Sequence, residues 1–103
     1  MRMFPIALAL ALFAGGTDLA HADQELLQKK NCFACHSIDK RKYGPKFVDI
    51  AAKYANDSGA AANLAKKIKS GSSGVWGEDQ MPPQPQVSDA DALALAKYVL
   101  SLK

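Results

Sequence analysis

Apolar residues recur at helical spacing in several stretches of this 103-residue chain. A first helix is expected from Asp23, whose side chain can cap it, to about Asn31, with Leu26 and Leu27 on its inner side. Pro45 suits the first turn of a second helix, because the first N–H groups of a helix have no partner within it. The apolar residues after Pro45 fall at i, i+3, i+4 and i+7, the spacing of one helix face: Phe47, Ile50, Ala51 and Tyr54.

Two more helices are predicted in the second half of the chain. One runs from about Ala60 to Ser70, where Gly71 is expected to stop it. The other opens at Ser88 with an S-x-x-D variant of the capping box and carries apolar residues at helical spacing. Those expected to face inward are Leu95, Ala96, Val99 and Leu102. The pattern offers no strand of any quality and therefore predicts an all-α domain of about four helices.

The segment between these two helices, residues 71–86, contains three Gly and three Pro and has no periodicity. Irregular segments of this length in compact domains are usually functional or disordered. We expect this segment to carry part of a functional site.

The N-terminus has the features of a secretory signal peptide. Arg2 supplies a positive charge, residues 6–14 form an unbroken apolar run, and Ala20-His21-Ala22 fits the small-x-small rule of signal peptidase. The run is too short to span a membrane, which takes about 20 residues. We expect residues 1–22 to be a cleaved signal peptide and residues 23–103 to be a single exported domain with no stable membrane insertion.

The size and charge of the chain narrow the classes of function. A domain as short as residues 23–103 gains little stability from its apolar core alone, so a disulfide, metal or cofactor commonly supports it. The formal net charge of +3 is modest, and no basic stretch is interleaved with stacking aromatic residues. This pattern does not suggest a nucleic-acid partner.

Cys32-Phe33-Ala34-Cys35-His36 has the spacing of a c-type haem attachment site. Two thiols reach two vinyl groups on one porphyrin edge, and the next His is then placed at the iron. A Cys32–Cys35 disulfide would close a very small loop and stabilise little. A thioredoxin-type pair expects a βαβ setting, and structural zinc needs four ligands, which residues 23–103 do not offer. The motif therefore predicts one covalently bound haem c.

Met81 is the best candidate for a second iron ligand. Residues 23–103 contain no other Met and no second His, and a Met thioether is a soft, neutral ligand that suits haem iron. Pro82 and Pro83 stiffen the backbone next to it. If His36 and Met81 both bind, the iron has no vacant position, and one-electron transfer is the chemistry that remains.

The motifs together resemble those of the short bacterial class I cytochromes c, of the cytochrome c-551/c-552 type. The resemblance covers essentially all of residues 23–103. It is carried by the haem-attachment motif, Gly44-Pro45, Gly74-Val75-Trp76-Gly77, Met81-Pro82-Pro83, Val87-Ser88-Asp89 and a closing Leu-Ala-Lys-Tyr helix. Where many members have Asn after Met-Pro-Pro, this chain has Gln84, which leaves the orientation of the Met side chain open.

The resemblance implies a role for each matching position. Cys32 and Cys35 would carry the thioether bonds, and His36 and Met81 would be the axial ligands. The Pro45 carbonyl would accept a hydrogen bond from the His36 ring, which fixes its tautomer. Trp76 would direct its indole N–H at a haem propionate. Lys67 matches a second, basic propionate partner, although Lys66 can reach the same region.

These observations lead to the expectation of a periplasmic, monomeric one-electron carrier rather than an enzyme. By family resemblance, a membrane quinol-oxidising complex could reduce it, and a nitrite reductase or terminal oxidase could accept its electron. Two alternatives remain: a haem enzyme or gas sensor with a displaceable Met81, and a thiol–disulfide protein. Basic side chains could also form a docking surface for acidic partners: Lys29, Lys30, Lys40, Arg41, Lys42 and Lys46.

Overall fold

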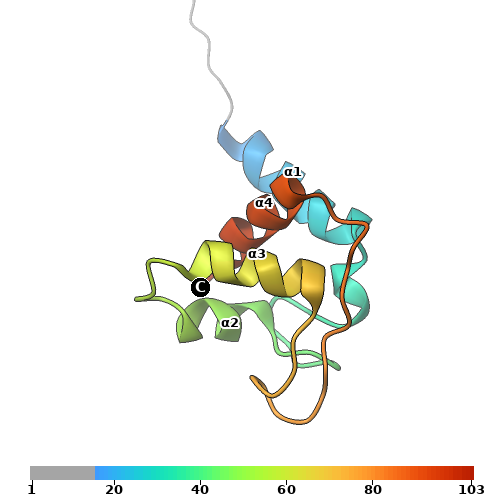
Figure 1. Cartoon of the computed structure of the whole chain (residues 1–103). Coiled ribbons are helices and arrows are strands. Elements are labelled where there is room, and N and C mark those ends of the chain that lie inside the picture. The colour runs from blue at the N-terminus through green and yellow to red at the C-terminus, as the bar shows by residue number, and fades with distance from the viewer. Residues whose placement is uncertain (1–15) are drawn as a thin grey trace, which may run out of the picture.

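The computed structural model describes residues 16–103, with side chains described from Asp23 onwards. This part of the chain contains four α-helices and no strand. They are α1 (Gly16–Lys29), α2 (Phe47–Lys53), α3 (Ala60–Ser70) and α4 (Asp89–Leu100), with a short 3-10 helix, η1 (Cys32–Ala34), after α1 (Figure 1). The predicted all-α class is confirmed.

The apolar run at residues 6–14, on which the signal-peptide prediction depends, lies outside the described residues. Within the described residues, every helix is too short or too polar to cross a lipid bilayer.

Two helix starts differ from the sequence prediction. The first helix already begins at Gly16, so Asp23 lies inside α1 and does not cap it. Residues 16–22 form the first part of this helix and continue directly into Asp23. The second helix begins at Phe47, with Lys46 as an extended N-cap, so Pro45 precedes the first turn. The Pro45 carbonyl accepts a hydrogen bond from the His36 ring instead of joining the helix.

The last helix, α4, is the centre of the fold because it packs against α1, α2 and α3. Leu95 is 1% exposed and Ala92 is fully buried, and both face the interior of the helical cluster. Apolar residues from the other helices and from the segment before α4 complete the core: Leu27, Phe47, Ile50, Val87 and Val99. The core is small and built around one helix.

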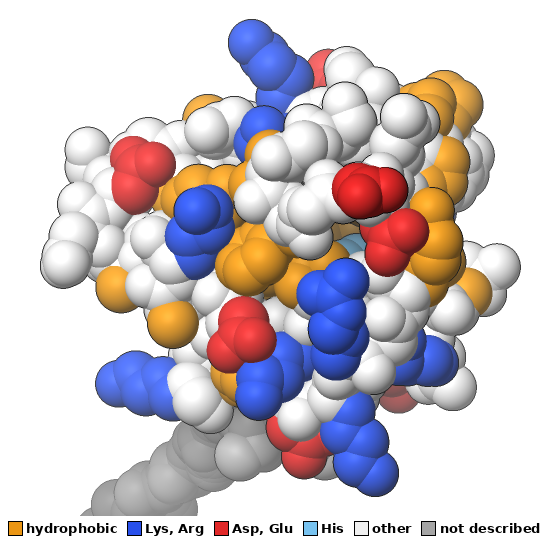
Figure 2. Space-filling view, turned by 90° about the horizontal axis from the view of Figure 1, so that it is seen from below, with side chains coloured by type: hydrophobic (Ala, Val, Ile, Leu, Met, Phe, Trp, Pro, Cys, Tyr) orange, Lys and Arg blue, Asp and Glu red, His pale blue; other side chains and the backbone are white. Residues whose placement is uncertain are grey.

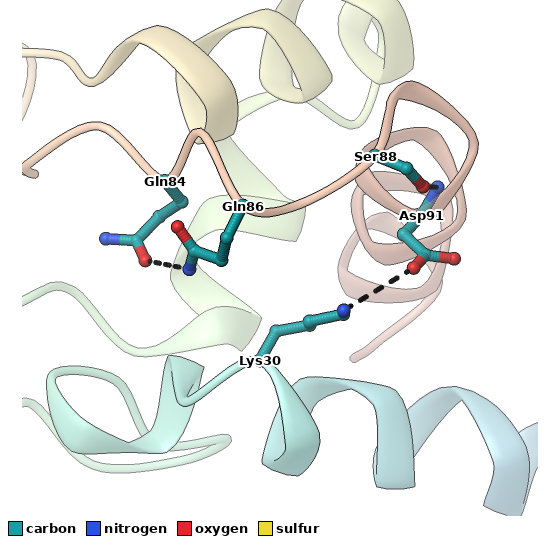
Figure 3. Close-up of polar contacts among 5 residues, drawn as sticks. All are labelled: Lys30, Gln84, Gln86, Ser88 and Asp91. Carbon is teal, nitrogen blue, oxygen red and sulfur yellow. Dashed lines mark hydrogen bonds and ion pairs between the residues drawn. The ribbon is translucent and has the colours of Figure 1, made fainter.

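Polar contacts fix the beginning of α4 (Figure 3). The Ser88 hydroxyl accepts a hydrogen bond from the Asp91 backbone N–H at 3.0 Å, which confirms Ser88 as the N-cap. The Asp91 carboxylate lies 3.8 Å from the Lys30 ammonium, just after α1. In the segment leading into α4, Gln86 donates a hydrogen bond of 2.8 Å to the Gln84 side-chain oxygen. The Lys30–Asp91 pair connects the end of α1 to the beginning of α4, far apart in the sequence.

Gly71 ends α3 as the sequence predicts and also lets the chain fold back. Its φ of +81° favours glycine, and its N–H donates to the Lys67 carbonyl at 2.8 Å. A Cβ atom at this position would lie 2.7 Å from the Met81 carbonyl oxygen. Any other residue would therefore push away the segment that carries Met81.

The packing of α4 gives a direct test of the core. Leu95→Ala removes a buried side chain and should lower the free energy of unfolding by about 2–5 kcal/mol. Leu93 lies on the same helix but is 36% exposed. Leu93→Ala should therefore change stability by no more than about 0.5 kcal/mol. Guanidinium unfolding of the haem-containing protein measures both, and equal losses would contradict this assignment of the buried face.

Candidate functional site

One cavity brings together all the site residues predicted from the sequence. Its walls come from the haem-attachment motif, the loop before α2, the end of α3 and the irregular segment 72–84, and its floor includes Leu95 and Val99 of α4. The predicted residues that line it are Cys32, Cys35, His36, Pro45, Lys67, Trp76 and Met81. Figure 2 shows this side of the molecule as an apolar hollow with charged side chains of both signs around it.

The two cysteines are brought to the cavity by a tight turn. Asn31 adopts a left-handed conformation with φ 68°, which reverses the chain between α1 and η1. The Cys32 carbonyl then accepts hydrogen bonds from the backbone N–H groups of Cys35 and His36, at 3.2 and 3.0 Å. Both thiols are free and half-buried. Burial, opposed by a backbone hydrogen bond and aided by the nearby Cys35, raises the pKa of the Cys32 thiol.

The ring of His36 is held as a neutral imidazole. Its Nδ1 lies 2.8 Å from the Pro45 carbonyl oxygen, and because a carbonyl can only accept, Nδ1 carries the hydrogen. The Nε2 lone pair is therefore left for a ligand bond. Burial lowers the pKa of His36, and the hydrogen bond to Pro45 opposes this only in part. The side chain is thus neutral at pH 7, the form that binds a metal.

Two neighbours fix the plane of the His36 ring. Phe47 stacks on it with ring centroids 4.8 Å apart and an interplanar angle of 23°. A Cβ atom on Gly44 would lie 2.6 Å from His36 Cε1, so the ring occupies the space that a side chain would need. The sequence analysis predicted Phe47 only as part of the apolar face of a helix, and Gly44 only as part of the Gly44-Pro45 motif. The Gly44-Pro45 pair was the sequence signal that the backbone lies close to the His36 ring here.

Met81 is held by its backbone and lines the same cavity as His36. Its N–H and carbonyl pair with Ser72 at 2.9 and 3.0 Å, which joins the two arms of the segment between α3 and α4. Pro82 and Pro83 follow directly and restrict the chain. The half-buried Met81 side chain therefore leaves a constrained backbone at the edge of an apolar cavity.

Two basic side chains near the end of α3 differ in position. Lys67 is half-buried and lines the cavity, whereas Lys66 is exposed and does not line it. Trp76 also lines the cavity and is half-buried. A positive ammonium and an indole N–H are suitable partners for a carboxylate.

An ion pair that the sequence did not predict connects two segments of the cavity rim. Arg41, in the loop after the haem-attachment motif, lies 3.7 Å from Asp79, two residues before Met81. The Lys42 ammonium donates a hydrogen bond of 2.7 Å to the Phe33 carbonyl, inside the motif itself. Neither contact could be read from local sequence pattern, because each joins two segments that only the folding of the chain brings together.

The residues of this cavity fit a covalently bound haem. Two free thiols lie in one turn, and a neutral, oriented imidazole and a soft thioether line the same apolar space. Thiols, imidazole and thioether are the donor set that c-type haem attachment and ligation require. An apolar cavity also suits the flat, largely apolar surface of a porphyrin.

Comparison with known proteins identifies the class to which this fold and cavity belong. The sequence matches the family model described as "Cytochrome c" over residues 22–103. The chain therefore belongs to the cytochrome c family.

Its relatives narrow this to small haem c electron carriers. The chain is 55% identical to cytochrome c-552 of Nitrosomonas europaea over 95 residues, which cover 92% of this chain and 90% of that protein. It is 53% identical to cytochrome c-551 of Pseudomonas aeruginosa over 106 residues, covering 98% of this chain and all of that one.

A crystal structure of the wild-type Nitrosomonas europaea cytochrome c552 is similar in fold. The TM-score is 0.76 at 56% identity, covering 78% of this chain and 99% of that one. The predicted class I cytochrome c fold is confirmed, as is a single haem c attached through Cys32 and Cys35.

The space around His36 gives a test with a matched control. Gly44→Ala places a Cβ atom against the imidazole and should cost about 1–3 kcal/mol of stability, as overpacking typically does. It should also disturb the visible spectrum of the haem. Gly59→Ala is the control, since its Cβ would make only an ordinary contact at 3.6 Å. If the two variants unfold at the same denaturant concentration with unaltered spectra, the tight fit around His36 is wrong.

Proposed function

We propose that this protein is a one-electron carrier of the periplasm whose haem iron is ligated by His36 and Met81. The observation that carries the proposal is the placement of these two side chains on one apolar cavity that also holds Cys32 and Cys35. The haem supplies reversible exchange between Fe(II) and Fe(III). The protein keeps the imidazole neutral and oriented, excludes water with apolar walls, and holds the backbone that carries Met81.

Two protein ligands on the haem iron would suit electron transfer better than substrate chemistry. If His36 and Met81 both held the iron, no coordination position would be left for peroxide or a diatomic gas. No second histidine is found among the side chains that the structure describes, and Arg41, which lines the cavity, is engaged with Asp79. The alternative of a haem enzyme would need a group that polarises a bound ligand.

Lys67 and Trp76 are proposed to contact the haem propionates. Lys67 lines the cavity, and its charge complements a carboxylate. The exposed position of Lys66 makes it the weaker candidate. Together, Lys67 and Trp76 would fix the polar edge of the porphyrin while the apolar walls hold the rest.

The proposed function includes export and redox partners. Residues 1–22 have the pattern of a signal peptide, and c-type attachment suits an exported chain. We propose a monomer that receives its electron from a membrane quinol-oxidising complex and passes it to a nitrite reductase or a terminal oxidase. Such exchange needs brief encounters rather than stable complexes.

The predicted basic docking surface is weaker than the sequence suggests. Lys30 is paired with Asp91, and Arg41 with Asp79, so acidic neighbours offset two of its six charges. Lys42 is directed at the Phe33 carbonyl. Lys29, Lys40 and Lys46 are left as the main source of attraction for an acidic partner.

Met81→Ala tests the proposed ligand set. The wild-type oxidised protein should be low-spin and show a weak far-red band from sulfur-to-iron charge transfer. The variant should lose that band and become high-spin, because Ala offers no ligand. Gln80→Ala, which changes the exposed neighbouring residue, should keep both features. High-spin iron in the wild type, or an intact band in Met81→Ala, would exclude Met81 as the ligand.

Electron exchange with an acidic soluble redox protein tests the surface charges. The rate should fall modestly as salt rises, because ions screen the attraction. Lys40→Met should slow exchange at low salt, whereas Asp79→Asn should speed it by releasing Arg41. Lys97→Met removes the same charge from an exposed lysine outside the predicted docking surface and serves as the control. A rate that is independent of salt and unchanged by both Lys40→Met and Asp79→Asn would refute electrostatic docking but leave the carrier function standing.

A further inference from the structure

The irregular segment between α3 and α4 has few contacts of its own. Ser72 pairs with Met81, but residues 73–80 make no hydrogen bond within the described chain. Gly74 and Gly77 flank the middle of the segment with φ of +79° and +110°, and nothing lies within 4 Å of where their Cβ atoms would be. The position of this segment must therefore depend on side-chain contacts to other parts of the molecule.

Trp76 lies in the middle of that segment and is touched by a lysine from another element. The Lys53 ammonium, at the last residue of α2, lies 5.5 Å from the centroid of the Trp76 ring. It also lies 5.9 Å from the centroid of the Tyr54 ring, which follows it in sequence. Both distances are within the roughly 6 Å range of cation–π attraction, and Trp gives the strongest form of that attraction. Lys53 thus joins α2 to the loosely held segment through Trp76.

We propose that Lys53 is a positioning residue of the haem site. Its ammonium holds the indole ring of Trp76 at the edge of the cavity and adds a positive charge there. A nearby positive charge stabilises the reduced haem, which carries one positive charge fewer, so Lys53 raises the reduction potential. The inference rests on the proposed contact between Trp76 and a haem propionate.

The helix that carries Lys53 connects both sides of the haem site. The same helix that ends with Lys53 begins with Phe47, which stacks on His36. Trp76 and Tyr54 both line the cavity. The short α2 helix thus contacts the His36 ring at one end and the Trp76 ring at the other.

The test uses three substitutions in the haem-containing protein. Lys53→Met keeps most of the aliphatic side chain but removes the charge, and Lys53→Arg restores a cation able to stack on the ring. Lys66→Met removes the same charge from a lysine that, like Lys53, is exposed and does not line the cavity, but that makes no cation–π contact among the described residues. Trp76 is the one tryptophan of the sequence, so a single indole N–H signal in the ¹⁵N–¹H NMR spectrum reports on its position.

Lys53→Met should shift or broaden the indole signal and lower the reduction potential more than Lys66→Met does. Lys53→Arg should return both towards the wild-type values. The fall in potential should shrink as salt is raised, because screening weakens the contribution of an exposed charge. The proposal is overturned if Lys53→Met matches Lys66→Met in either readout, or if Lys53→Arg fails to rescue.

A separate variant distinguishes this inference from the function on which it rests. Trp76→Phe keeps an aromatic ring but removes the N–H, so it should change the reduction potential if Trp76 contacts a propionate. An unchanged potential would contradict that contact. The three lysine variants, compared in the Trp76-containing protein, still decide whether Lys53 positions the ring.

Discussion

The orientation of a single imidazole is the constraint on which this site depends. The Pro45 carbonyl fixes the tautomer of His36, Phe47 covers one face of its ring, and the bare Cα of Gly44 leaves it room. Each contact comes from the loop or helix that follows the haem-attachment motif. Because the pKa of His36 is lowered by burial, the ring is neutral and ready to bind iron without first losing a proton.

The rest of the cavity around His36 is formed by α4 and by the segment between α3 and α4. The α4 helix supplies the centre of the core, and Leu95 and Val99 reach from it to the cavity floor. The segment that carries Met81 is fastened at its two ends by Ser72 and by the Gln84 N–H, which donates to Ile68 at 3.0 Å. Between these points its contacts are sparse, and the ion pair of Arg41 with Asp79 holds it only at the exposed rim. Trp76, which is half-buried and packs against the core, is the main apolar anchor of its middle.

The sequence predicted the parts of this structure that depend on local pattern. Helical spacing placed α3 and α4 closely, Gly71 stopped α3, and Ser88 capped α4. The start of α2 was wrong by two residues, because the Pro45 carbonyl is used by His36, a tertiary contact that periodicity does not contain. Asp91 was expected to complete a capping box but instead faces Lys30, across a distance set by helix packing. The roles of Gly44, Arg41 and Lys53 likewise depend on contacts between segments distant in sequence.

Carbon monoxide binding by the reduced protein tests the central claim most directly, since it asks whether the iron is closed by two protein ligands. With His36 and Met81 both bound, the spectrum of the reduced protein should remain unchanged after rapid mixing with carbon monoxide, over the time needed for electron transfer to a soluble redox protein. Rapid formation of a carbon monoxide complex, accompanied by turnover of peroxide, would contradict the electron-carrier account and favour a haem enzyme.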